Sequence, residues 1–474
     1  MSRSRRWIER ENPAEPTQIV GEVPLTGPAA VDAVARKAHE QFLEWSPRPI
    51  AERLAVLSEA ADALAGRVPE LAVLLARESG KPIADCRGEI AFAVTYLRWV
   101  CANAASVLTD SALDDEGGRL EIGAVPFGVV LAITPWNAPV ILSMLKLAPA
   151  LAAGNAAVLK PSPLAPLTVQ AVADMLPHTT VVHGDPETVL ALIGHDAVRK
   201  VAFTGGETAG RSIAAAAGGA LKPVLLELGG NDPAIFLDDF RLSDSDYERL
   251  VLASFATSGQ VCMAAKRLYV PRGRYAEFVD SYRAAAARIL TVGDPTDEAV
   301  TMGPVVSRAA ADRVAALLTD AVERGGQLIT LAHAPDSDGY FLSPTLVLDL
   351  PDDADLVRLE QFGPALPVLT YDTVEEVVER ANDSELGLGA SVWSADEERA
   401  FAIASRLEAG FTFVNTHNRT GMSLRAPFGG RKKSGFGREY GEEGLREYAQ
   451  SAVRHLPAAF RAGGAGSAAN AYPT

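Results

Sequence analysis

Phe203-Thr204-Gly205-Gly206-Glu207-Thr208-Ala209-Gly210 joins an apolar run at 199–203 to a helical run at 208–217. Glycines at a strand-to-helix turn let a phosphate approach the backbone, and the N-terminus of the helix favours an anion. The turn is not the GxGxxG fingerprint of dinucleotide-binding sites, because its outer glycines are five positions apart (210 − 205). Taken alone it is a weak nucleotide signal, and a plain tight turn is the simpler interpretation.

The alternation of strands and helices extends in both directions from this turn. A series of helices at 28–107 comes first, followed by strand-like runs at 119–125 and 128–133. Such alternation predicts a parallel sheet with helices on both faces, and such sheets bind ligands at the carboxyl ends of their strands. The expected strands are 156–159, 179–183, 199–203 and 223–227, and the expected helices are 145–151, 166–176, 186–193 and 208–217.

A second alternating region begins near residue 233. We expect its helices at 244–257, 274–290, 307–324, 373–382 and 396–406, and its strands at 266–270, 367–371, 389–393 and 410–414. One late strand is expected at 451–456, and the Gly/Ala/Ser-rich tail 461–474 is expected to be flexible. A chain of 474 residues is long enough for two or three domains.

Composition excludes several classes of function. The net charge of −16 argues against a nucleic acid or an anionic membrane as the main partner. Three cysteines, without a CxxC pair, predict a reducing compartment such as the cytoplasm and no metal site. No apolar core of a signal peptide follows the basic start. The sequence has no uninterrupted run of about 18 apolar residues, so no transmembrane helix is expected.

Two short segments carry the strongest chemical signal. Cys262 closes Gly259-Gln260-Val261-Cys262, thirty-five positions (262 − 227) after Glu227 opens Glu227-Leu228-Gly229-Gly230. A thiolate can attack an aldehyde carbon, and a carboxylate can later activate the water that releases the acyl group. Taken alone, Cys262 is better explained as a buried structural cysteine and Glu227 as an ordinary carboxylate at a strand end.

Other segments allow a chemical and a structural interpretation. Asn137, held between Pro135 and Pro139, can donate to an oxyanion or simply cap a rigid turn. Lys160 at a strand end can meet a ribose or phosphate, although a lone lysine is more often a surface residue. Glu360 can hold ribose hydroxyls or belong to a turn. We assign Cys86 and Cys101 structural roles.

Taken together and in order, these segments resemble the NAD(P)-dependent aldehyde dehydrogenase superfamily from about residue 12 to about 456. Eight segments carry the resemblance: Pro135-Trp136-Asn137-Ala138-Pro139, Ala148-Pro149-Ala150-Leu151-Ala152-Ala153-Gly154-Asn155, Lys160-Pro161-Ser162, Phe203-Thr204-Gly205, Glu227-Leu228-Gly229-Gly230, Gly259-Gln260-Val261-Cys262, Glu360-Gln361-Phe362-Gly363-Pro364 and Pro427-Phe428-Gly429-Gly430.

The resemblance implies an activity and a role for each matching residue. The activity is oxidation of an aldehyde to a carboxylic acid through a cysteine thiohemiacetal and thioester. Cys262 matches the nucleophile, Asn137 the oxyanion-hole amide, Glu227 the general base, and Lys146 a lysine near that amide. Residues implied to contact the cofactor are Lys160 and Glu360 at the two riboses, Phe362 beside the nicotinamide ribose, Gly205 in the nucleotide turn, and Thr134, Trp136, Ser162, Gly206 and Leu228.

The resemblance also implies an α/β fold of the aldehyde dehydrogenase type. It has a Rossmann-type nucleotide-binding domain (1–118 and 127–227), an α/β catalytic domain (228–440), a small β oligomerisation element (119–126 and 441–460) and a tail (461–474). A homodimer or homotetramer is therefore expected, with NAD as the cofactor and NADP as the second possibility.

The sequence departs from the family in places that concern cofactor and substrate. Pro163 stands where many NAD-preferring members carry a glutamate on the adenosine ribose, and Gly206 stands where serine is common. Ala138, Ile141, Leu142, Leu145 and Met263 around the catalytic segments are apolar, which predicts a hydrophobic aldehyde tunnel. His417, Asn418 and Arg419 are expected to border its entrance and are able to hold a polar tail.

Three other interpretations stay open. A CoA-acylating aldehyde dehydrogenase passes the acyl group to a thiol, but members of that class generally lack a glutamate at the position of Glu227. A catalytically silent member of the fold would be expected to lose Cys262, Asn137 or Glu227, and all three are present. A Cys-His hydrolase is disfavoured because no histidine lies in a catalytic-looking segment near Cys262.

Overall fold

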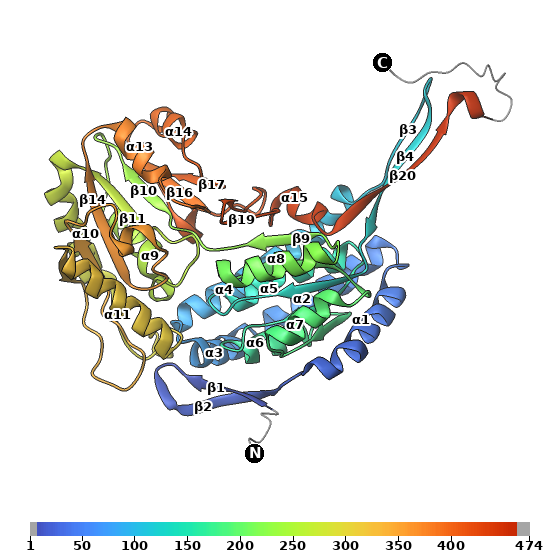
Figure 1. The fold of residues 1–474 in the computed structure, drawn as a ribbon, viewed down its shortest axis with the longest axis horizontal. Helices are drawn as coiled ribbons and strands as arrows, with labels where there is room; N and C mark the ends of the chain where they lie inside the picture. Colours follow the sequence, from blue (N-terminus) through green and yellow to red (C-terminus); the bar gives the residue numbers. More distant parts are fainter. Residues whose placement is uncertain (1–6, 462–474) are drawn as a thin grey trace.

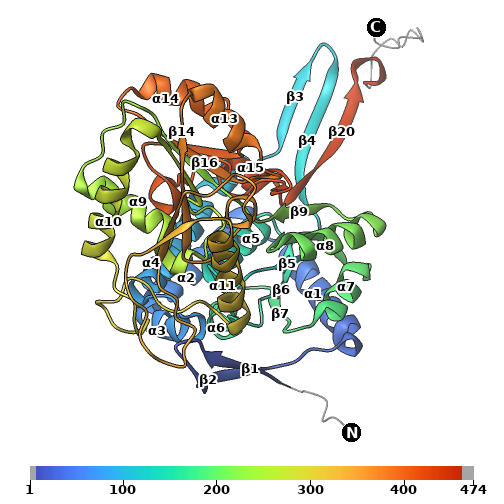
Figure 2. The same cartoon turned by 60° about the vertical axis from the view of Figure 1, so that its left-hand side comes forward.

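The computed structural model describes residues 7–461 and contains two large sheets joined side by side, with a narrow arm that projects from the body (Figure 1). The arm lies on the opposite side of the molecule from an N-terminal hairpin, as Figure 2 also shows. That hairpin, β1 (Trp7–Asn12) and β2 (Glu15–Pro24), is not predicted from the sequence. The predicted flexible segment 461–474 lies outside the described residues except for Arg461.

The first sheet has the strand order β19-β9-β8-β5-β6-β7. Five of its strands, β5 to β9, run parallel in four neighbouring pairs, as the alternation of strands and helices predicts, and the sixth strand, β19, is antiparallel to β9. The chain order reverses between β5 and β8, and open α/β sheets bind ligands at such a switch point. The strands are β5 (Val129–Ile133), β6 (Ala156–Lys160), β7 (Thr179–Val181), β8 (Val198–Thr204), β9 (Val224–Glu227) and β19 (Gly435–Phe436).

Helices cover both faces of this sheet because its strands are apolar on both sides. In β5, Val130 and Ala132 pack on one helical layer, while Val129, Leu131 and Ile133 pack on the other. One layer contains α2 (Ile50–Gly66), α3 (Val68–Ser79), α4 (Ile83–Val107), α5 (Pro139–Ala152) and α6 (Pro166–Ala173), and the other contains α1 (Val31–Trp45), α7 (Pro186–Gly194) and α8 (Glu207–Gly219).

Helix α4 is long and apolar enough to cross a membrane by length and composition alone. In this structure it packs against α2, α3 and α5, and residues such as Ile90, Ala93 and Leu97 lie in the core between those helices. Its sequence is interrupted by Asp85 and Arg98. The apolar residues of α4 are therefore explained by its position in the core, where three other helices pack against it.

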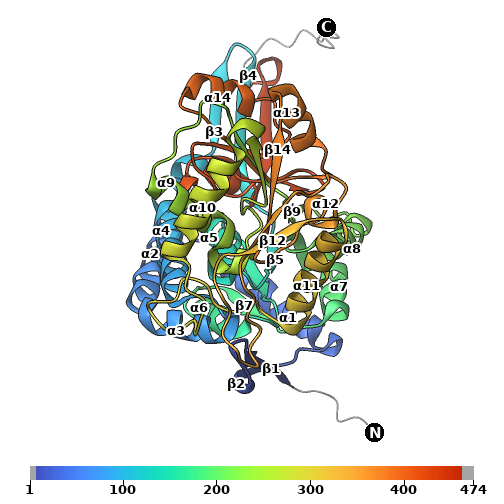
Figure 3. The same cartoon turned by 90° about the vertical axis from the view of Figure 1, so that its left-hand side faces the viewer.

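The second sheet has the order β12-β13-β14-β11-β10-β16-β17, and only β12 runs antiparallel to its neighbour. Helices α9 (Asp244–Phe255) and α10 (Tyr275–Ile289) lie on one side and α11 (Arg308–Glu323) and α12 (Asp355–Arg358) on the other (Figure 3). The α11 side also packs against α13 (Val374–Asn382) and α14 (Glu397–Ala404). The strands are β10 (Pro233–Phe236), β11 (Arg267–Pro271), β12 (Gln327–Thr330), β13 (Thr345–Leu348), β14 (Ala365–Tyr371), β16 (Gly389–Trp393) and β17 (Phe411–Val414).

Sequence patterns miss β10, β12 and β13, and they place some helix ends wrongly. The helix expected at 244–257 ends at Phe255, because Thr257 and Ser258 adopt left-handed backbone conformations with φ of 55° and 58°. The helix expected at 166–176 ends at Ala173. The irregular turn after α9 leads directly to Gln260, Val261 and Cys262.

The arm is a three-stranded antiparallel sheet in the order β20-β4-β3. It contains β3 (Ser111–Asp115), β4 (Gly118–Pro126) and β20 (Ala449–Pro457), so the two segments expected to share one element are hydrogen-bonded to each other. A short pair, β15 (Leu386–Gly387) with β18 (Arg431–Lys432), and a short helix, α15 (Gly441–Arg446), complete the described elements.

Asn155 joins three segments near the first sheet through a fully buried amide. Its Oδ1 accepts from Gly128 N (3.0 Å), and its Nδ2 donates to Ala150 O (3.0 Å) and Tyr448 O (2.8 Å). The three bonds connect the start of β5, the end of α5 and the residue before β20. A buried backbone group that loses its partner costs about 1–3 kcal/mol.

We predict that Asn155→Ala lowers the free energy of unfolding by about 3 kcal/mol, because three backbone groups lose one partner each. The shift of the urea unfolding midpoint measures the loss. Asn103→Ala is the matched control, since Asn103 is half-buried and donates only to Trp99 O within α4. Equal midpoints for the two variants would contradict the assigned role of Asn155.

Candidate active site

Two cavities meet at the junction of the two sheets. One of about 300 Å³ and one of about 440 Å³ share Asn137, Leu142 and Cys262 in their walls. The nucleophile predicted from sequence therefore faces both spaces, and the predicted oxyanion amide lies beside it. Among the described residues no group of three or more metal-ligating side chains lies close enough to hold a metal ion.

Asn137 and Cys262 are brought together by a direct bond between their segments. Asn137 follows β5 and is buried, and its Nδ2 donates to Gln260 O at 3.0 Å. Gln260 is held in turn, because its side chain donates to Thr257 O and accepts from Val306 N. The amide of Asn137 is thus fixed two residues from the sulfur-bearing position.

The N-terminus of α5 behind Asn137 is capped by a residue from another helix. Ala138 at the N-cap has no side-chain cap, and Glu89 of α4 supplies one by accepting from Val140 N (2.8 Å) and Ile141 N (3.3 Å). Glu89 also forms a buried ion pair with Lys81. Neither residue is predicted from the sequence, although both line the smaller cavity.

Cys262 is half-buried where the two cavities meet, and desolvation of its thiol raises the pKa to about 12. The Lys266 ammonium lowers this pKa, whereas the nearby carboxylates of Glu360, Asp232 and Glu227 raise it. The sequence leads us to expect surroundings that favour the thiolate. The structure departs from that expectation, because loss of solvent outweighs the single nearby cation.

Glu227 lies at the end of β9, 4% exposed, and it lines neither cavity. Burial and repulsion from Glu439 raise its pKa well above the usual range, and Lys146 lowers it. Its Oε1 has no hydrogen-bond partner within residues 7–461. A raised pKa makes a carboxylate a stronger acceptor for a proton from water.

Lys146 of α5 is fully buried, and no hydrogen bond within residues 7–461 joins it to Asn137. Its Nζ donates to Glu439 Oε1 and to Thr204 Oγ1, both at 2.6 Å. Glu439 is a further residue that sequence patterns miss, since it lies in a glycine-dense segment that indicates only a turn. Lys146 therefore ties α5 to the end of β8 and to the segment that approaches Glu227.

The larger cavity lies at the carboxyl ends of β5, β6, β8 and β9. Trp136 and Phe362 meet edge to face across it, with ring centroids 5.5 Å apart. Gly206 is the N-cap of α8, so a turn of free backbone N–H groups faces the space. All nine residues expected to contact a cofactor line this one cavity: Thr134, Trp136, Lys160, Ser162, Gly205, Gly206, Leu228, Glu360 and Phe362.

These residues fit an extended dinucleotide. The cavity runs from the half-buried Lys160, which ends β6, and the buried Ser162 to Cys262 and Phe362. Gly205 leaves space where a Cβ atom would lie 2.5 Å from the ring of Phe203. One carboxylate, Glu360, is available for ribose hydroxyls in the cavity wall.

The smaller cavity is mainly apolar. Its wall contains Phe92, Ala138, Ile141, Leu142, Val261, Met263 and Met422. Leu145, predicted for this wall, is instead buried within the core of the first domain.

Two of the three residues expected at the entrance do not lie there. His417 is 1% exposed with its Nδ1 2.7 Å from Ser391 Oγ, and Asn418 is 2% exposed with its Nδ2 donating to Ala253 O. Only Arg419 lines the cavity, and it pairs with Asp85 at 2.9 Å. The histidine and asparagine are turned inward because they hold the loop that presents Arg419.

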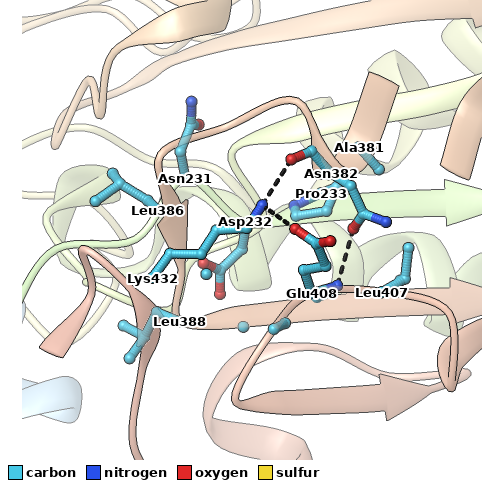
Figure 4. A pocket seen from close by; sticks show the side chains of 14 residues that line it. Asn231, Asp232, Pro233, Ala381, Asn382, Leu386, Leu388, Leu407, Glu408 and Lys432 are labelled. Carbon is cyan, nitrogen blue, oxygen red and sulfur yellow. Dashed lines mark hydrogen bonds and ion pairs between the residues drawn. The ribbon is translucent and has the colours of Figure 1, made fainter. Parts of the chain in front are cut away.

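A third cavity lies behind the Glu227 turn, between Asn231, Asp232 and Lys432 (Figure 4). Lys432 bridges it by pairing with Glu408 (2.5 Å) and donating to Asn382 O (2.7 Å). Its volume of about 10 Å³ is the size of one water molecule, so neither an aldehyde nor a nucleotide enters it.

Comparison with known proteins gives a consistent result. A family model described as "Aldehyde dehydrogenase family" matches residues 1–453. The chain is 35% identical to succinate-semialdehyde dehydrogenase [NADP(+)] of Deinococcus radiodurans (93% of each chain) and 38% identical to geranial dehydrogenase of Castellaniella defragrans (92% of each).

Among solved structures, the chain is similar to succinic semialdehyde dehydrogenase from Streptococcus pyogenes in complex with NADP+. The TM-score is 0.90 and the identity 28%, with 95% of this chain and 100% of that chain covered. The resemblance seen in the sequence and the expected α/β fold are thereby confirmed.

We predict that the Cys262 thiol of the ligand-free protein is alkylated by iodoacetamide about ten times faster for each unit of pH between 7 and 10, without a plateau, because its pKa lies near 12. Mass spectrometry measures the modified fraction. Cys262→Ala corrects for Cys86 and Cys101, whose pKa values burial also raises. A plateau below pH 9 would contradict the inferred state of the thiol.

Proposed function

We propose, from the premise that the chain belongs to the aldehyde dehydrogenase family, that it oxidises an apolar aldehyde to the carboxylic acid with NAD or NADP. The observation that carries the proposal is the meeting of the two cavities at Asn137 and Cys262. An aldehyde in the smaller space and a dinucleotide in the larger one would both reach the sulfur.

Cys262 acts as the nucleophile in this proposal. Its thiol proton passes to a water molecule, its sulfur bonds to the carbonyl carbon, and the carbonyl oxygen becomes an oxyanion. The side-chain amide of Asn137 and the backbone N–H of Cys262 are the donors for that oxyanion. One such donor contributes about 3–4 kcal/mol to the transition state. Asn137 uses one of its two side-chain N–H donors on Gln260 O in this structure, which orients the amide and leaves the other donor for the oxyanion.

The nicotinamide supplies the hydride acceptor when the cofactor is bound. Departure of hydride from the tetrahedral carbon leaves a thioester on Cys262. Glu227 then removes a proton from water, the resulting hydroxide attacks the thioester, and the acid leaves as the thiolate is restored. Lys146, paired with Glu439, stabilises the ionised form of Glu227 and so opposes the effect of burial.

An apolar substrate is supported by the wall of the smaller cavity. Phe92, Ile141, Val261, Met263 and Met422 would surround an aldehyde with hydrocarbon and sulfur. Geranial dehydrogenase, named for a hydrocarbon-chain aldehyde, is among the similar proteins, but so are succinate- and glutarate-semialdehyde dehydrogenases. The identity of the aldehyde is therefore proposed on the cavity wall and not on the names.

NAD preference stays a prediction. Pro163 lies in the wall of the larger cavity at a position where a carboxylate would repel a 2′-phosphate, and Lys160 beside it carries a positive charge. Both residues support binding of NADP as well. Two of the similar proteins carry NADP in their names, which leaves NADP as the second cofactor to test.

A homodimer or homotetramer in the cytoplasm completes the proposal. The arm of β3, β4 and β20 exposes Leu113, Ile122, Val453 and Leu456, which would be covered by a second copy of the chain. The domain division at residues 118, 126, 227 and 440 is proposed on the same basis, although β19 (Gly435–Phe436) joins the first sheet from within the segment assigned to the catalytic domain.

We predict that the purified protein reduces NAD or NADP in the presence of long-chain aliphatic or terpenoid aldehydes and releases the free acid. Absorbance at 340 nm and product chromatography follow the two products, and a panel that includes succinate semialdehyde tests substrate class. Cys262→Ala should retain dinucleotide binding and lose all turnover. Acyl-CoA formation on adding CoA would favour the acylating class, and no turnover with any aldehyde would favour a silent member.

We predict that Glu227→Gln gives a burst of about one NAD(P)H per active site and then stalls, because the thioester forms but water is not activated. Stopped-flow absorbance measures the burst, and intact-mass analysis detects the acyl adduct on Cys262. A steady state equal to that of the unchanged protein would remove Glu227 as the base.

A further inference from the structure

Lys266 precedes β11 and its side chain is 2% exposed. Its Nζ donates to three acceptors: Cys262 O at 2.5 Å, Gly230 O at 2.6 Å and Glu360 Oε1 at 2.7 Å. An ammonium group has three N–H donors, so each is used once. The sequence alone gives no signal for this residue, because one lysine before a strand is ordinary.

The three acceptors belong to three segments with different proposed tasks. Cys262 carries the nucleophile, Gly230 ends the turn that begins with the base Glu227, and Glu360 is the carboxylate expected at a ribose. They are separated from Lys266 by 4, 36 and 94 positions in the chain. A single cation therefore holds parts of the site that the backbone does not connect.

The backbone of Lys266 is itself fixed, so the side chain extends from a defined point. Lys266 N donates to Asp232 O at 3.0 Å, and Lys266 O accepts from the side chain of Gln361 at 3.1 Å. The ammonium also lies 5.7 Å from the centre of the Phe362 ring. The two residues that follow Glu360 in the chain thus also lie beside Lys266, Gln361 through a hydrogen bond and Phe362 through its ring.

Glu360 is held on one side only. Its Oε1 accepts from Lys266 Nζ and from Gly230 N at 3.1 Å, whereas no hydrogen bond within residues 7–461 uses Oε2. The carboxylate is 19% exposed and lies in the wall of the larger cavity. Fixing one oxygen directs the other toward that cavity, where a pair of hydroxyl groups would find an acceptor.

Lys266 also sets the charge balance around the sulfur. Of the charged groups that affect the Cys262 thiol, it is the one that favours the thiolate, and three carboxylates oppose it. Removing it would leave Glu360, Asp232 and Glu227 without that opposition.

We propose that Lys266 is a positioning residue that aligns the ribose-binding carboxylate of Glu360 and the loop of Cys262 in one arrangement, and thereby serves cofactor binding and nucleophile reactivity together. The proposal rests on the proposed function. A purely structural lysine would stabilise the fold through the same three bonds, but its loss would leave the carboxylate and the thiol with unchanged properties once the protein is folded.

Lys266→Met, which keeps the length and removes the charge, tests this. Two measurements on the protein without aldehyde are decisive: the Kd of NADH and NADPH by fluorescence titration, and the rate of Cys262 alkylation by iodoacetamide at pH 9. We expect weaker dinucleotide binding and slower alkylation, each by about tenfold, since one pKa unit changes the thiolate fraction tenfold. Values for both within twofold of the unchanged protein would overturn the proposal.

Lys200→Met is the matched control. Lys200 is 1% exposed and its Nζ pairs with Glu447 at 2.7 Å, but it lines neither large cavity. This variant should lose stability and change both measured values less than twofold. Equal losses in the two variants would mean that general destabilisation, and not the position of Lys266, causes the effect.

Lys266→Gln provides the measurement should the methionine variant fail to fold. Glutamine retains an N–H donor for a carbonyl and lacks the charge, so alkylation should slow by about tenfold as for methionine. Unchanged alkylation would overturn the charge role.

A double-mutant cycle with Glu360→Gln isolates the cofactor part. If Lys266 acts on the cofactor through Glu360, adding Lys266→Met to the Glu360→Gln variant should weaken NADH binding by less than twofold relative to Glu360→Gln alone. Fully additive losses would overturn the positioning role. If the protein oxidises aldehydes and the Lys266 variants keep normal binding and alkylation, this inference is wrong and the proposed function stands. If the variants change binding and alkylation but the unchanged protein oxidises no aldehyde, the proposed function is wrong and the role of Lys266 stands.

Discussion

Three buried lysine–glutamate pairs surround the point where the two cavities meet, and the arrangement of the site depends on them. Lys146 pairs with Glu439, Lys266 with Glu360, and Lys81 with Glu89, and each lysine side chain is at most 3% exposed. A buried charge that loses its partner costs about 3–5 kcal/mol. Each pair therefore holds its two segments together, and between them they fix α5, the cysteine loop and the carboxylate in the cofactor wall.

The same burial keeps the Cys262 thiol protonated. A thiol with a pKa near 12 lies about five units above neutral pH, which corresponds to about 7 kcal/mol against the thiolate. That value already includes the lowering effect of the Lys266 ammonium, so one nearby cation is insufficient to favour the thiolate. Further stabilisation has to come from groups that enter the cavities or from movement of the carboxylates near the sulfur. The resting thiol is correspondingly a poor target for oxidants.

The parts of the fold predicted from the sequence are those that depend on local periodicity. Val129 to Ile133 and the other apolar runs of the first sheet have one structural solution, a strand covered on both faces. β12 and β19 escape detection because they are short and largely exposed, and the partner of β19 lies about 200 positions earlier in the chain. Within the site, Cys262, Asn137 and Glu227 belong to ordered motifs, whereas Lys266, Glu89 and Glu439 gain their meaning only from partners 8 to 293 positions distant. His417 and Asn418 are misplaced for a related reason, since a sequence does not indicate toward which side of a loop a polar group turns.

Charge pairing also bears on the kind of aldehyde that the smaller cavity accepts. A substrate with a second carboxylate needs a cation that is not already neutralised, because burying an unpaired carboxylate is costly. The two cations in that wall are Lys81, paired with Glu89, and Arg419, paired with Asp85. An anionic tail would have to break one of these pairs, and breaking the Lys81 pair would also disturb Glu89, which caps α5 beside Asn137. An uncharged hydrocarbon tail disturbs neither pair and gains the contact area of the apolar wall, so the electrostatics and the lining argue for the same class of substrate.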